Sequence, residues 1–137
     1  MTNPIVEIVE QLRDALWVER DIDAALALID PGAEFDWSDS RAPYGGHFKG
    51  HRELTRAFEV QMDAWDEWRP EVEEVIEIDA STVLLMTHVR GRGKGSGVPV
   101  EAHGASVWSV RDGRVTYAKI FQSKAAALDA LGLRSAS

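Results

Sequence analysis

The sequence predicts an α+β fold in which helices cover one face of a strongly bent sheet. Three observations support this prediction. Apolar residues recur at helical spacing in two stretches of the first half, alternating segments follow one another from residue 71 to residue 122, and a helical pattern closes the chain. The 137 residues fit a single domain, residues 1–137, that buries about two thirds of the surface of the unfolded chain.

The chain opens with two predicted helices. Asn3 can cap the first helix and Pro4 suits its first position, and apolar residues then follow helical spacing to about residue 20. Asp21 caps a second, shorter helix, which the turn-forming residues 30–32 end.

A short strand and a loop come next. Residues 33–38 alternate Phe35 and Trp37 with polar side chains, as a strand with one buried face does. Residues 38–50 are irregular and rich in glycine, and their aromatic side chains are suited to line a site.

A third helix is predicted from His51 to about Trp68, where large side chains recur every three or four residues. The stripe consists of Leu54, Phe58, Met62 or Gln61, and Trp65. Core packing and a ligand-facing wall explain this stripe equally well, so both interpretations stay open.

Four strands follow, over residues 71–78, 82–90, 98–110 and 114–122. The glycine-rich residues 91–97 connect two strands, whereas a phosphate-binding loop must lead into a helix, so we expect only a mobile connection there. Ser123 caps a last helix over residues 124–131, and Gly132 is placed to end it.

The last two strands form a long β-hairpin around Arg111-Asp112-Gly113. The face that carries Trp108 is apolar throughout, so it looks toward a core or a cavity. A two-residue turn places Trp108 opposite Tyr117, whereas a three-residue loop places it opposite Thr116. A slip of one residue exchanges the faces of the second strand, and the apolar pattern slightly favours the two-residue turn.

The composition excludes several classes of partner. A net charge of -8 opposes binding to nucleic acid or to an anionic membrane, because neutralised phosphates supply most of the affinity for nucleic acid. The lack of cysteine excludes disulfides, thiolate metal sites and cysteine nucleophiles. The sequence shows no membrane-spanning apolar run and no signal-peptide pattern, so we expect a cytoplasmic protein.

Several motifs resemble those of one protein family. They are Asp21-Ile-Asp23 with residues 33–37, Gly50 at the start of the third helix, the glycine-rich residues 90–97, residues 107–113 and residues 127–133. Together they cover nearly the whole chain, which resembles the SnoaL-like polyketide-cyclase family of the nuclear-transport-factor-2-like superfamily. Ketosteroid isomerase and limonene epoxide hydrolase belong to the same superfamily. The resemblance is specific for fold and weak for function, since this scaffold hosts many activities.

The resemblance implies a cone-shaped barrel, in which a strongly bent mixed or antiparallel sheet wraps around N-terminal helices and encloses a pocket. In related enzymes the pocket-facing residues of the last strand fall at Ala118 and Ile120, which requires the three-residue loop. Val107, Tyr117 and Phe121 then face outward, and we expect them to be buried against a second copy in a homodimer.

The same resemblance implies a set of pocket residues. Two polar residues, His88 and Arg90, are the catalytic candidates, because an imidazole can act as a general acid or base and a guanidinium can hold an oxyanion or a carboxylate. The alternative is a hydrogen-bonded core histidine and an arginine at the rim, paired with Glu101 or Asp39. The predicted ligand-binding residues are Trp17, Phe35, Trp37, Tyr44, Phe58, Met62, Trp65, Met86, Ser106, Trp108, Ala118 and Ile120.

Departures from the named relatives narrow the mechanism. Ketosteroid isomerase uses a carboxylate base, a tyrosine and a protonated acid, and the corresponding positions here hold Trp37, Arg13 and Ser106. Limonene epoxide hydrolase uses an aspartate, an arginine and a second aspartate, and these positions hold Arg90, His88 and Ile120. Both sets of catalytic residues are therefore incomplete.

Two functions remain open. The first is a cofactor-independent isomerase, cyclase, dehydratase or hydrolase that acts on a small hydrophobic substrate by acid–base chemistry. The second is a non-catalytic homodimeric protein that binds a hydrophobic ligand. We expect no cofactor and no metal, because His47 and His51 straddle a helix start and do not share one helical face.

Overall fold

The structure, a computed structural model, describes residues 3–39 and 45–132. It confirms the α+β class. No helix in these two ranges is long and apolar enough to cross a membrane. The elements are α1 (Pro4–Trp17), α2 (Ile22–Leu26), β1 (Ile29–Asp36), β2 (His47–Lys49), α3 (Gly50–Ala64), β3 (Trp65–Asp79), β4 (Thr82–Gly93), β5 (Pro99–Arg111), β6 (Arg114–Phe121) and α4 (Lys124–Leu131).

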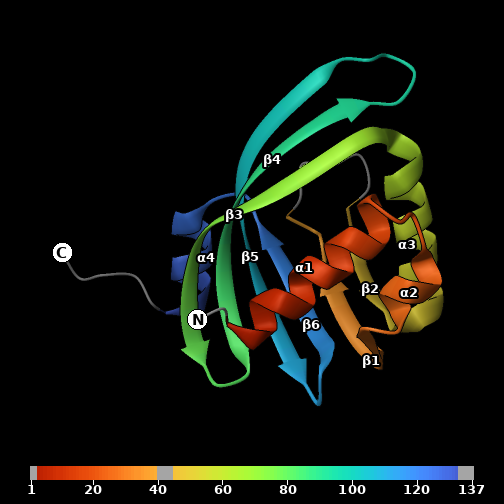
Figure 1. The fold of residues 1–137 in the computed structure, drawn as a ribbon. Coiled ribbons are helices and arrows are strands. Elements are labelled where there is room, and N and C mark those ends of the chain that lie inside the picture. Colours follow the sequence, from red (N-terminus) through yellow and green to blue (C-terminus); the bar gives the residue numbers. More distant parts are fainter. Residues whose placement is uncertain (1–2, 40–44, 133–137) are drawn as a thin grey trace.

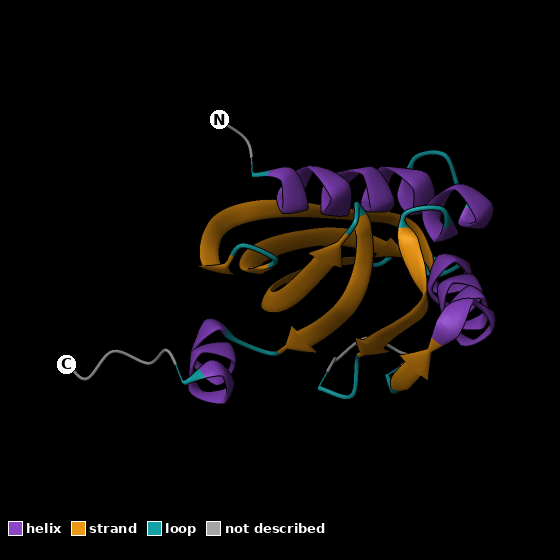
Figure 2. Cartoon of the chain, turned by 90° about the horizontal axis from the view of Figure 1, so that it is seen from below, coloured by secondary structure: helices purple, strands orange, loops and turns teal. Residues whose placement is uncertain are grey.

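All six strands belong to one mixed sheet with the order β2-β1-β6-β5-β4-β3. The neighbours β1 and β6 are parallel, and the other neighbouring pairs are antiparallel. Register shifts interrupt the pairing of the long strands β3 and β4, and such irregularities bend a sheet. The bent sheet curves around α1, whereas α4 lies on its opposite side (Figure 1 and Figure 2).

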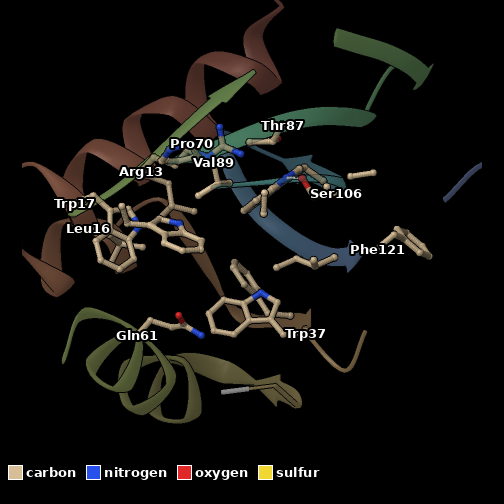
Figure 3. Close-up of a pocket in the computed structure, with 18 of the residues that line it drawn as sticks. Arg13, Leu16, Trp17, Trp37, Gln61, Pro70, Thr87, Val89, Ser106 and Phe121 are labelled. Carbon is tan, nitrogen blue, oxygen red and sulfur yellow. Dashed lines mark hydrogen bonds between the residues drawn. The ribbon is translucent and has the colours of Figure 1, made fainter. Parts of the chain in front are cut away.

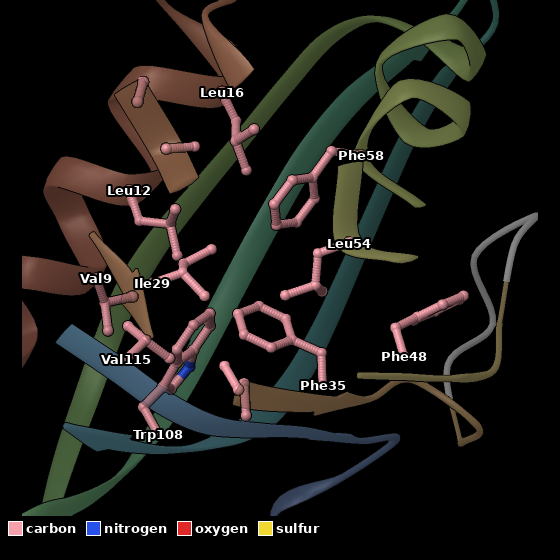
Figure 4. Close-up of a cluster of buried hydrophobic side chains, with 14 of the residues drawn as sticks. Val9, Leu12, Leu16, Ile29, Phe35, Phe48, Leu54, Phe58, Trp108 and Val115 are labelled. Atoms are coloured by element: carbon pink, nitrogen blue, oxygen red, sulfur yellow. The ribbon is translucent and has the colours of Figure 1, made fainter. Parts of the chain in front are cut away.

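The main core lies between α1, α3 and the inner face of the sheet (Figure 4). Phe35 is at its centre with 1% exposure, and its ring makes edge-on contacts with Trp37, Phe58 and Trp108 at centroid distances of 6.1, 6.1 and 5.8 Å. Edge-to-face packing of this kind adds stabilisation beyond the buried area. The inner face is therefore built largely from aromatic rings.

Arg20 connects the helical layer to the sheet. It follows α1 in a left-handed conformation with φ 54°. Its guanidinium donates hydrogen bonds to the carbonyl oxygens of Met62, Trp65 and Asp66 at 3.2, 3.3 and 2.9 Å. Met62 lies in the last turn of α3, and Trp65 and Asp66 begin β3, so one side chain satisfies acceptors on both sides of the helix–strand junction.

Several element boundaries differ from the prediction, and β4, for example, runs to Gly93, into the residues predicted as a connection. The third helix ends at Ala64, and Trp65 already belongs to β3. Strand β1 starts at Ile29 and runs through Pro31 and Gly32. Its pairing with β6 is irregular between Ile29 and Glu34, so the missing backbone N–H of Pro31 does not interrupt a regular ladder of hydrogen bonds. The predicted loop contains the short strand β2, which pairs with β1. In each case pairing with a neighbouring strand overrides a local signal.

The β5–β6 hairpin combines features of both predicted registers. Asp112 and Gly113, with φ 53° and 77°, form a two-residue turn in which Arg111 pairs with Arg114. The register then shifts, because Val115 pairs with Val110 but Tyr117 pairs with Ser109. Thr116 is the extra residue, so the three-residue loop is wrong, although the shift turns Ala118 and Ile120 inward as the resemblance implies.

A second, smaller core lies between the outer face of the sheet and α4. Val107 and Phe121 are 4% and 6% exposed there and pack with Met86 and Ala127. The expectation that a second copy buries Val107 and Phe121 is therefore wrong, because helix α4 of the same chain covers them. Tyr117 is half-buried.

Candidate ligand-binding site

A cavity of about 390 Å³ lies inside the cone, between α1, α3 and the inner face of the sheet (Figure 3). Its walls come from Leu12, Arg13, Leu16 and Trp17 of α1; Phe35 and Trp37 of β1; Phe58, Gln61 and Met62 of α3; Trp68 and Pro70 of β3; Thr87 and Val89 of β4; residues 101–106 and Trp108 of β5; and Ile120 and Phe121 of β6. Asp39 and Gln122 complete the lining.

Aromatic rings dominate these walls. The ring centroids of Trp17 and Trp68 are 6.1 Å apart and those of Trp37 and Phe58 are 6.0 Å apart, and Phe35 and Trp108 also line the cavity. Rings offer a large apolar contact area with few rotatable bonds, so they suit a flat, apolar ligand.

The structure brings together eight of the twelve residues predicted to bind a ligand. They are Trp17, Phe35, Trp37, Phe58, Met62, Ser106, Trp108 and Ile120. Their contact with a ligand stays a prediction. Tyr44 lies outside the described residues.

Three predicted residues lie elsewhere. Trp65 does not line the cavity, because α3 ends before it, and Trp68 of β3, whose ring is 4.8 Å from that of Trp65, does so in its place. Ala118 is buried in the main core without reaching the cavity. Met86 packs beneath α4 on the outer face.

His88 and Arg90 are on the opposite face of β4 from the cavity. Thr87 and Val89 line the cavity, and side chains alternate along a strand, so His88 and Arg90 share the outer face with Met86. The predicted face is therefore wrong. Both faces of β4 are buried and apolar near its start, so the amino-acid pattern does not distinguish them.

His88 belongs to a polar cluster at the edge of the cavity. Its Nε2 is 2.5 Å from Oε1 of Glu101, and its ring stacks on that of His103 at 4.4 Å. Glu101 and His103 line the cavity where β5 extends beyond the end of β6. The ligand atoms of these three side chains lie within 4.8 Å of one another, close enough to share a metal ion. Arg90 is exposed.

Arg13 and Thr87 are among the polar groups of the cavity that were not predicted as site residues. Burial lowers the pKa of Arg13 to about 10, against an opposing effect of Glu10, and still leaves the guanidinium protonated at neutral pH. Thr87 is 7% exposed, and its Oγ1 has no hydrogen-bond partner within residues 3–39 and 45–132. Alternation along β4 could have identified Thr87 once the inner face was known. Arg13 stood out only as the residue that replaces the tyrosine of ketosteroid isomerase.

Comparison with known proteins identifies the family. The family model of the SnoaL-like domain matches residues 9–118. No curated protein matches the chain.

Solved structures share the fold at low sequence identity. An NTF2-like protein of unknown function from Burkholderia pseudomallei is 23% identical with a TM-score of 0.71, over 94% of this chain and 97% of that one. A Mycobacterium tuberculosis protein in complex with estradiol-17β-hemisuccinate is 16% identical with a TM-score of 0.73, over 90% and 97%. A ketosteroid isomerase from Mycobacterium sp. is 16% identical with a TM-score of 0.70, over 88% and 93%. With the family model matching most of its length and the NTF2-like cone as its fold, this chain belongs to the SnoaL-like domain family.

Proposed function

We propose that this protein binds a small, largely apolar molecule inside its cone. The observation that carries the proposal is the cavity of about 390 Å³ with walls of tryptophan and phenylalanine. Its volume falls within the usual range of about 300–1,000 Å³ for small-molecule sites. The complex of the similar M. tuberculosis protein with estradiol-17β-hemisuccinate supports a small organic ligand for this fold.

Catalysis is the second candidate function, and the polar cluster at the cavity edge favours it. Glu101 and His103 line the cavity, and a carboxylate or an imidazole there can accept a proton from a bound substrate. His88 then acts through Glu101, which it contacts. In this form of the cofactor-independent enzyme, the catalytic candidates are Glu101 and His103 instead of His88 and Arg90.

A thermal-shift screen against small aromatic acids, phenols, lactones, epoxides and ketones tests binding, with each hit followed for product. Val89 lines the cavity, so Val89→Trp is expected to fill it and to abolish the rise in melting temperature that a ligand causes. Val75→Trp, at a site that is 40% exposed, is the matched control and keeps that rise. Equal stabilisation of both variants places the ligand outside the cone and contradicts the proposal.

Product formation separates the two functions. If a hit is converted and Glu101→Gln abolishes turnover while binding persists, the protein is an enzyme. If every hit is recovered unchanged, the non-catalytic function stands.

The proposal includes a homodimer formed through the outer face of the sheet. Helix α4 covers Val107 and Phe121, so the area around the half-buried Tyr117 is the part of this face that we assign to contact with a second copy. Light scattering at micromolar concentration measures the mass, and Tyr117→Glu is expected to convert a dimer into a monomer.

A further inference from the structure

Arg13 places in the cavity wall a cation that has no hydrogen-bond or ion-pair partner in the part of the chain that the structure describes. Arg13 extends from α1 into the cavity wall and is half-buried (Figure 3). The nearest carboxylate that acts on it is Glu10, an exposed residue one turn earlier on the same helix. Among residues 3–39 and 45–132, no hydrogen bond or ion pair forms with the Arg13 guanidinium. A buried charge of this kind costs stability, since its lost hydration is not replaced.

Thr87 is an independent sign of a missing partner in the same cavity. Thr87 is more than nine-tenths buried and lines the cavity from β4, and its hydroxyl neither donates a hydrogen bond to any described residue nor accepts one from it. Buried hydroxyls are rarely left in that state, because each costs about as much as a lost hydrogen bond. A ligand oxygen would satisfy it.

The carboxylates that line the cavity are engaged with other groups. Asp39 accepts hydrogen bonds from the backbone and side-chain amides of Gln122, and Glu101 contacts His88. Both carboxylates therefore already have hydrogen-bond partners other than Arg13. Ser106 accepts a hydrogen bond from the Trp108 indole at 2.8 Å, which leaves its own hydroxyl hydrogen for a ligand. The polar groups of the cavity that are left for a ligand, the Arg13 guanidinium and the hydroxyls of Thr87 and Ser106, can therefore all donate a hydrogen bond.

We propose that the ligand is an organic anion, an aromatic or polycyclic body that carries a carboxylate or a phenolate, and that Arg13 binds this oxygen while Thr87 donates a second hydrogen bond. The inference rests on the proposed function and adds the charge of the ligand to it. The aromatic walls hold the body, and the guanidinium selects the anion over neutral molecules of the same shape.

A matched pair of probes tests the inference by calorimetry. 2-Naphthoate and 2-naphthamide have the same shape and differ in charge. Wild-type protein is expected to bind the anion at least about ten-fold more tightly, since a hydrogen bond to a charged group is worth about 10- to 100-fold in affinity. Arg13→Met should remove this preference and weaken naphthoate about 10- to 100-fold, with naphthamide changed by less than about two-fold. Thr87→Val should weaken naphthoate by a smaller factor.

Two controls separate binding from folding. Arg52→Met removes an exposed arginine on α3 and should change neither affinity. Ligand-free Arg13→Met should melt at the same or a higher temperature than wild type, because it removes an unpaired charge, so a loss of naphthoate binding cannot come from unfolding.

The outcomes distinguish this inference from the function on which it rests. If both probes bind wild type equally and Arg13→Met changes neither, the anion inference is overturned and the apolar site stands. If neither probe nor any compound of the screen binds, the proposed function fails and the inference fails with it.

Discussion

Trp108 of β5 lies directly opposite Ala118 of β6, one residue further along than the two-residue turn between these strands would place it. The extra residue, Thr116, opposes no residue of β5 and exchanges the faces of everything after it. Ile120 consequently lines the cavity, and Tyr117 faces outward beside Ser109. One residue in a hairpin thus decides which side chains line the site.

Deletion of Thr116 is expected to be tolerated. Without it, regular alternation keeps Val115 and Ala118 inside and Tyr117 outside, at a cost of about 1 kcal/mol for the lost side-chain hydrogen bond to the Ser109 carbonyl. Deletion of Lys119 should prevent folding, because it sends Ile120 outward. Circular dichroism and urea unfolding measure both variants, with Lys119→Ala as the control for the lost ion pair to Asp36. Equal damage from the two deletions would contradict the bulge assignment.

Arg20→Met is expected to lower the free energy of unfolding by about 1–2 kcal/mol, since three carbonyl oxygens at the α3–β3 junction lose their donor. Urea unfolding at pH 7 gives the value, and Arg52→Met is the control for removing a positive charge. An effect no larger than that of the control would show that water replaces the guanidinium without cost.

Asp36 should contribute stability that disappears in acid. Hydrogen bonds from Ser38, with a further contribution from Lys119, lower its pKa to about 2. Since this folded-state value is below the unfolded value of about 3.9, the stabilisation is present above pH 4 and is lost as the pH falls toward 2. Asp36→Asn is therefore expected to cost about 1 kcal/mol at pH 7 after allowance for solvent screening, and only a small fraction of that near pH 2, where about half of this carboxyl is protonated in the folded state. A difference that persists unchanged at pH 2 would assign the effect to packing.

His88→Ala should leave ligand affinity within about two-fold of wild type, because the imidazole is on the outer face of β4 and meets the cavity only indirectly, through Glu101 and His103. Calorimetry with the best compound of the screen measures it, with Thr87→Val as the neighbouring variant on the inner face. A loss of affinity in His88→Ala that exceeds the loss in Thr87→Val would make the polar cluster part of the binding site.

The sequence by itself determined the class of fold and the ends of several helices. Asn3, Asp21 and Ser123 cap the helices that follow them, and Gly132 ends the last one with φ 67°. These features are predictable because a cap depends on hydrogen bonds within four residues of the chain. The motifs that resemble the SnoaL-like family predicted the cone and most of the aromatic wall. Each of these motifs is a short run of neighbouring residues, so it can be recognised without the tertiary structure.

Only the tertiary structure decided which faces of the strands meet the cavity. Both faces of β4 are apolar at its start, so the pattern could not show that Thr87 points in and His88 points out. The bulge at Thr116 and the end of α3 before Trp65 depend on pairing with strands that are distant in sequence. Arg13 is unremarkable on a helix and becomes a candidate anchor only because, within the described residues, the sheet closes around it and no acid forms an ion pair with its guanidinium. The burial of a side chain and its hydrogen-bond partners depend on residues that are distant in sequence, so a local sequence pattern does not predict them.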